Sequence, residues 1–219
     1  MSSTHTRNHF NSDPRHWQAG PILSAGVLEP LHELNRAWLA LLATMPRHWT
    51  AQAGSRLPDP VCAGLLTLSG EQRADVARCP FSLFSARFND GLYWLGVTAS
   101  GEVHDFEFTD EFAREIGEFG QLALFFAWHL VRANPASARI VLGMSDQTIS
   151  VFASLSLATV QRLGHCPGLF SARWPDRNWF WLRLLASATQ SETAEVRTLG
   201  LQMLAAELTA SARRDAPAL

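Results

Sequence analysis

Arginine residues next to aromatic residues are the clearest candidates for binding chemistry in this sequence. The pentapeptide Leu-Phe-Ser-Ala-Arg occurs twice, each time followed by an aromatic residue, and more arginines and tryptophans follow the second copy. Guanidinium groups stack on aromatic rings and pair with phosphates and carboxylates. The pattern is therefore typical of contact with a nucleic acid or an acidic protein surface, and equally of an interface anchored by Trp and Arg. The candidates are Arg87, Arg173, Arg177 and Arg183, with the aromatic residues Phe88, Trp174, Trp179 and Trp181.

The same residues have a plain structural interpretation. Large aromatic side chains are common in cores, and an arginine beside them often pairs with a local carboxylate. The pattern therefore leaves two possibilities open, an interaction surface and local core packing.

Two predicted pairs of short helices look superficially like helix-turn-helix units. A recognition helix presents basic and amide side chains to phosphates and base edges, and ordinary packed helix pairs are the alternative. The second helices of the pairs, over 69–78 and 156–164, offer few such side chains, namely Gln72, Arg73, Arg78, Gln161 and Arg162.

Histidines, cysteines and carboxylates form no recognisable catalytic or metal-binding pattern. His165 precedes Cys166, but a Cys–His nucleophile pair also needs a group that orients the imidazole. The acidic run from Asp105 to Glu111 fits the solvent face of a strand followed by the first turn of a helix. The sequence has no Cys-x-x-Cys pair, phosphate loop or nucleophile elbow. We therefore expect no enzyme activity, no metal and no cofactor.

The composition is that of a globular protein. The chain has 219 residues, of which 47% are hydrophobic and 17% charged, and its formal net charge is −2. All 18 basic residues other than histidine are arginine, which a coding bias explains as readily as a recognition surface. The slightly negative net charge argues against broad, sequence-independent binding to nucleic acids. Three cysteines, no apolar leader and no long apolar stretch predict a cytoplasmic protein without membrane contact.

The sequence repeats itself at a spacing of about 87 residues. The segment from Cys79 to Phe88 recurs as Cys166 to Trp174, one residue shorter, and the same spacing aligns Asp59 with Asp146. Such agreement indicates an internal duplication. The predicted organisation is a polar, disordered tail over 1–20, a first repeat over 21–108, a second repeat over 109–212 and a C-terminal tail over 213–219.

Each repeat is predicted to begin with a long amphipathic helix, over Val27–Thr44 and Asp110–Ala133. Apolar residues recur there at helical spacing, and two short helices follow each long one. The residues expected to cap the short helices are Asp59, Asp146, Ser69 (with Gln72 completing a capping box) and Ser156.

The helices are predicted to lead into short strands joined by tight turns. Alternating apolar residues and turn signals such as Asn-Asp-Gly support this expectation. The predicted fold is therefore mainly α with short β-hairpins, an α+β class being the alternative, in two tandem pseudo-symmetric repeats. The expected strands are Leu83–Phe88, Leu92–Val97 and Val103–Phe108 in the first copy and Leu169–Trp174 and Trp179–Leu185 in the second, followed by a C-terminal helix over Ser191–Ala212.

The order of these parts resembles the FlhD family of flagellar transcriptional activators. In that family a long helix leads to a leucine-rich helix pair and then to an extended segment that ends in an Arg-Phe element. The matching segments are Leu34–Leu39, Leu66–Ser69 and Phe84–Phe88 in the first copy, and Ala127–Arg132, Leu142–Met144, Leu155–Leu157 and Phe170–Trp174 in the second.

The resemblance implies a helical, non-enzymatic bacterial transcription regulator. FlhD proteins dimerise and act with the subunit FlhC, which makes much of the DNA contact. We therefore expect an FlhC-like protein partner, partial direct contact with DNA, and two FlhD-like units that form the dimer within one polypeptide. A protein-interaction adaptor or assembly subunit without nucleic-acid binding is the alternative. A small-molecule-binding or enzymatic domain with an unfamiliar site is a third hypothesis.

Overall fold

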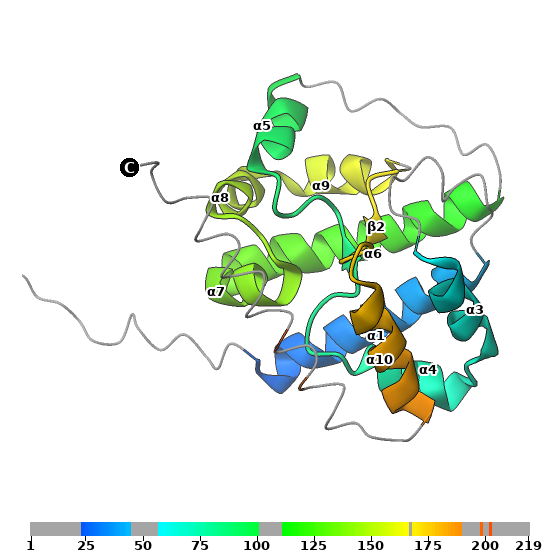
Figure 1. Ribbon diagram of the computed structural model, residues 1–219. Helices are drawn as coiled ribbons and strands as arrows, with labels where there is room; N and C mark the ends of the chain where they lie inside the picture. Colours follow the sequence, from blue (N-terminus) through cyan, green and yellow to red (C-terminus); the bar gives the residue numbers. More distant parts are fainter. Residues whose placement is uncertain are drawn as a thin grey trace, which may run out of the picture.

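The computed structural model describes residues 23–44, 57–100, 111–166 and 168–189, together with residues 198 and 202. Within these residues the chain is mainly helical and contains one small two-stranded sheet (Figure 1). The predicted predominance of α-helix is therefore confirmed. The expected tails, the expected strand Val103–Phe108 and the three repeat boundaries lie outside the described residues, as does the predicted C-terminal helix except for Thr198 and Gln202, which are helical.

The elements fall into two series that follow one another along the chain. The second series contains a short helix and a π-helical segment that have no counterpart among the described residues of the first. The first series is α1 (Ala25–Thr44), α3 (Asp59–Thr67), α4 (Gly70–Ala77), β1 (Phe84–Ser85) and α5 (Gly91–Ser100). The second is α6 (Glu111–Ala133), α7 (Pro135–Ser137), η2 (Ala138–Leu142), α8 (Asp146–Ser154), α9 (Leu157–Gly164), β2 (Ser171–Ala172) and α10 (Asn178–Thr189).

Serine side chains cap the short helices. The Ser69 hydroxyl accepts the backbone N–H of Gln72 at 3.2 Å, and the Gln72 side chain accepts the N–H of Ser69 at 2.9 Å. This reciprocal pair is the predicted capping box at the start of α4. Ser156 caps α9 by accepting the N–H of Thr159 at 3.1 Å, also as predicted.

The predicted N-caps Asp59 and Asp146 are wrong by one position. Both carboxylates lie in the first helical turn, where their negative charge interacts favourably with the positive end of the helix dipole. The residues before them are the caps: Pro58 at α3, and Ser145 at α8, whose hydroxyl accepts the N–H of Thr148 at 3.1 Å.

The predicted hairpins are also wrong. The segments 92–97 and 179–185 lie within helices α5 and α10. Their apolar residues fit a buried helical face as well as they fit a strand, and packing against other helices decides between the two. The extended segments 83–88 and 169–174 shrink to the two-residue strands β1 and β2, which pair with each other, Phe84 opposite Ala172 and Ser85 opposite Ser171.

Corresponding elements of the two series recur at one spacing. Helices α8 and α9, strand β2 and the start of α10 each lie 87 residues after α3, α4, β1 and the start of α5. The hydrogen bonds recur too. The Trp94 indole donates to the carbonyl groups of residues 86 and 87, and the Trp181 indole donates to those of residues 173 and 174.

The two series interlock. Helix α1 packs on α4 and α6 packs on α9, while the last helix of each series packs on the other series, α5 on α8 and α10 on α3 and α4. Figure 1 shows α1 and α6 at the centre, α5 at one end beside α8, and α10 beside α3 and α4. At the crossing, Phe119 lies 5.2 Å from both Trp38 and Phe84, between ring centroids, and 5.3 Å from Phe170. The core is therefore shared by both series.

Candidate functional site at the junction of the two series

Arg173 is the centre of the junction between the two series. Its side chain is only 4% exposed. One guanidinium nitrogen donates to the Ser82 hydroxyl at 3.1 Å and to the Val141 carbonyl at 2.9 Å. The same Val141 carbonyl accepts the backbone N–H of Ser82 at 3.0 Å. A single buried cation therefore joins the segment before β1, the end of η2 and the turn after β2.

Unusual backbone geometry gathers around Arg173. Residues 138–142 form a π-helical turn, which ends at Gly143 with φ of 71°. Arg87 and Trp174, in the turns after β1 and β2, have φ of 52° and 54°. Such conformations cost free energy and are concentrated at functional sites. A Cβ at Gly143 would also crowd the Arg173 guanidinium, so glycine is required here for two reasons.

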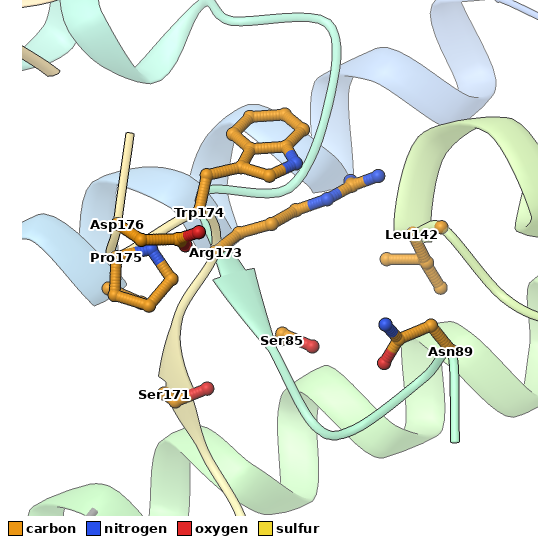
Figure 2. A pocket seen from close by; sticks show the side chains of 10 residues that line it. Ser85, Asn89, Leu142, Ser171, Arg173, Trp174, Pro175 and Asp176 are labelled. Atoms are coloured by element: carbon orange, nitrogen blue, oxygen red, sulfur yellow. The ribbon is translucent and has the colours of Figure 1, made fainter. Parts of the chain in front are cut away.

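A solvent-open pocket of about 260 Å³ lies beside this junction. Figure 2 shows the Arg173 side chain crossing it, with the Trp174 ring on one side and Ser85, Ser171 and Asn89 on the other. The lining comes from both strands, both following turns and the end of η2: Ser85, Asn89, Leu142, Gly143, Ser171, Ala172, Arg173, Trp174, Pro175 and Asp176.

The predicted arginine and aromatic candidates divide into surface and core residues. Arg87 is exposed and its guanidinium lies over the Tyr93 ring, 4.6 Å from the centroid, while Arg177 and Arg183 are exposed on the second series. Trp179 is 46% exposed. The others are buried: Phe88 and Trp181 at 0%, Trp174 at 7% and Arg173 at 4%.

Arg87 and Arg173 do not occupy equivalent positions in their turns, although the pentapeptides align them. The two pentapeptides lie 86 residues apart, whereas the strands β1 and β2 and the helices after the turns recur at a spacing of 87. The left-handed residue is Arg87 in one turn and Trp174 in the other. Arg173 therefore matches Ala86, and this shift by one residue directs its side chain into the junction.

The candidates on the short helices lie apart from the junction pocket. Arg78 pairs with Asp75 at 3.2 Å, and Arg73 is half-buried on α4. Gln161 and Arg162 are exposed on α9, and no described acidic side chain pairs with Arg162. The arrangement therefore does not gather these four side chains and the junction arginine into one surface.

Asn35 is the amide that anchors α1, and it is not among the residues predicted from the sequence. Its side chain is fully buried, donates to the carbonyl groups of Ala77, Cys79 and Phe81, and accepts the N–H of Leu83 at 2.8 Å. The sequence feature that could have identified it is a single amide, Asn35, within the apolar stripe of a predicted helix. Buried polar side chains require partners, so such an amide predicts a contact with irregular backbone nearby.

The cysteines and histidines show no catalytic environment within the described residues. Burial raises the pKa of the Cys79 thiol to about 11 and also raises the pKa of Cys166, so both thiols are poor nucleophiles. Burial, and then Arg78 and Arg36, lower the pKa of His32. No group of three His, Cys, Asp or Glu side chains in the described part of the chain is placed to hold a metal ion.

Comparisons of the chain with protein-family models, curated proteins and solved structures find no match. Among the described helices, none combines the length and apolar character that crossing a membrane requires.

Proposed function

We propose that this chain is a regulatory subunit built from two tandem FlhD-like repeats, which form the equivalent of a dimer within one polypeptide. It acts through an FlhC-like protein partner and contacts DNA directly only in part. The observation that carries the proposal is the reciprocal packing of α5 on α8 and of α10 on α3 and α4. Fusion of two subunits that had exchanged their last helices would place the last helix of each repeat against the other repeat in this way.

The charge distribution supports a minor role in DNA contact. The exposed arginines Arg162 and Arg177 have no acidic partner among the described residues. They can neutralise phosphates locally, whereas the net charge of −2 gives no broad basic surface. A partner subunit would then supply most of the affinity and the sequence specificity.

Two measurements test this proposal. Light scattering on the purified chain should give the mass of one polypeptide, because the dimer-like contacts are intramolecular. With a partner obtained by co-purification, binding to DNA should weaken steeply as salt is raised. Arg177→Ala should lower the salt slope by about one, and the buried Ser82→Ala should leave it unchanged. A dimer in solution, or a partner complex with no salt-sensitive DNA binding, would contradict the proposal.

A protein-interaction adaptor without nucleic-acid contact is the second candidate. Matching positions of α5 and α10 expose large apolar side chains, Leu92 at 75% and Leu95 at 41%, Trp179 at 46% and Leu182 at 40%. Exposed Trp and Leu are typical anchors of protein interfaces. Partner binding that depends on Trp179 and persists unchanged at high salt, without any DNA shift, would favour this candidate.

A further inference from the structure

We propose that the junction pocket binds a small, neutral, hydroxyl-rich molecule of the size of a monosaccharide or a cyclic polyol. Binding of such a molecule is independent of the regulatory function proposed above. It stands on the side chains that line the pocket, on their charges and on the pocket's volume.

Four polar side chains line the pocket without hydrogen-bond partners among the described residues. Ser85 and Ser171 are half-buried and stand opposite each other in the β1–β2 ladder, so their side chains lie on the same face. Asn89 and Asp176 are exposed at the rim. None of the four forms a hydrogen bond with another described residue, although each has donors or acceptors to offer. A ligand with several hydroxyl groups can both donate to and accept from this set.

The charges around the pocket favour a ligand without net charge. The buried Arg173 guanidinium already donates to Ser82 and Val141, and its carbon lies 4.4 Å from the centroid of the Trp174 ring, which covers it. The Asp176 carboxylate at the rim disfavours an anionic ligand, and Arg173 disfavours a cationic one. A neutral polyol avoids both penalties and uses the Asp176 carboxylate as a hydrogen-bond acceptor.

The size and apolar lining agree with this class. A volume of about 260 Å³ lies just below the roughly 300–1,000 Å³ of ordinary small-molecule pockets, which suits a ring of monosaccharide size. Drug-sized ligands occupy larger and more apolar pockets. Leu142 and Pro175 offer apolar contact for the C–H groups of such a ring, and Ser85, Ser171 and Asn89 offer hydrogen bonds to its hydroxyl groups.

Titration calorimetry and saturation-transfer NMR on the full chain test the proposal with glucose, galactose, ribose and myo-inositol. Glucuronate and glucosamine serve as ring-matched anionic and cationic probes. We expect at least one neutral probe to bind at millimolar concentration or below, and to bind more tightly than both charged probes. Ser85→Ala, Ser171→Ala and Asn89→Ala should each weaken binding about three- to tenfold, the effect of one neutral hydrogen bond.

Two further variants sharpen the result. Gln161→Ala removes an exposed amide outside the pocket and should leave the affinity unchanged. Asp176→Asn keeps an acceptor but removes the charge that strengthens its hydrogen bond, so it should weaken binding of the neutral probe by about three- to tenfold. The three alanine substitutions remove only small or exposed side chains, so the variants should fold like the parent chain. An unchanged thermal denaturation temperature would verify this.

Three results would overturn the proposal. The first is the absence of binding by every neutral probe at millimolar concentration. The second is binding that the combined Ser85→Ala and Ser171→Ala variant leaves unchanged. The third is tighter binding of glucosamine that Asp176→Asn abolishes, which would assign the pocket to ammonium ligands instead.

Discussion

The turns after β1 and β2 share their backbone geometry and place their arginines in opposite environments. In each turn a residue with positive φ precedes a helix whose tryptophan indole donates to two turn carbonyl groups. In the first turn that residue is Arg87, exposed and stacked on Tyr93. In the second it is Trp174, and Arg173 enters the core one position earlier.

This difference shows how little of a residue's role follows from its sequence motif. Both arginines end the same pentapeptide, yet the two pentapeptides lie 86 residues apart and the structural elements 87. This difference of one residue makes Arg87 a surface cation and Arg173 a structural link. Removal of a surface arginine costs little stability, whereas removal of a buried one leaves its hydrogen-bond partners buried and unpaired. The comparison therefore predicts unequal effects of identical substitutions.

The largest expected effect is that of Arg173→Ala. Loss of its hydrogen bonds to Ser82 and Val141, with the cavity left behind, should lower the free energy of unfolding by about 3 kcal/mol. Arg87→Ala removes only the exposed contact with Tyr93 and should cost less than about 1 kcal/mol. Urea denaturation of the two variants measures both values. Equal losses would show that burial of Arg173 does not distinguish the two turns.

A second comparison concerns Cys79 and Cys166, which follow helices α4 and α9 at matching positions. Cys79 is fully buried and its pKa is raised from 9.0 to about 11. The raised pKa means that the unfolded chain loses this proton first, so stability is intact below pH 9 and falls as the pH rises toward 11. The loss should reach about 2 to 3 kcal/mol, and no lysine titrates in this range because the chain has none.

Urea midpoints below pH 9 and near pH 11 test this prediction. Cys79→Ala should flatten the loss relative to the parent chain, although the substitution itself lowers stability at every pH. Cys166→Ala is the matched control, since Cys166 is only half-buried, and it should keep most of the fall. An undiminished fall in the Cys79→Ala variant would show that other groups cause it.

A third comparison concerns the indole hydrogen bonds of Trp94 and Trp181. Both indoles are fully buried and each N–H is shared between two carbonyl groups at 3.1 to 3.2 Å. Trp94→Phe and Trp181→Phe should therefore destabilise the chain by similar amounts, about 1 to 2 kcal/mol each. Thermal and urea denaturation measure the two losses. A difference greater than about 1 kcal/mol would contradict the equivalence of the two turns.

Local signals in the sequence were sufficient for the long helices and for the caps at Ser69 and Ser156. Each depends on residues a few positions apart, so the sequence contains the whole interaction. The helical state of 92–97 and 179–185 depends on packing between the two series, which no local pattern records. The junction pocket was not predictable for the same reason: Ser85 and Ser171 meet across 86 residues of chain, and nothing near either serine specifies its partner.

The smallest expected effect tests the backbone of the first turn. Arg87 has φ of 52°, a conformation that costs an L-residue roughly 1 to 2 kcal/mol and that glycine adopts without a steric cost. Arg87→Gly and Arg87→Ala both lose the contact with Tyr93, so their difference isolates the backbone. Arg87→Gly should be the more stable by about 1 kcal/mol. At Asn89, which is not among the positive-φ residues, glycine should be less stable than alanine because it gains more entropy on unfolding. The same order at both positions would mean that residue 87 does not hold the left-handed conformation in solution, and the match between Arg87 and Trp174 would then fail.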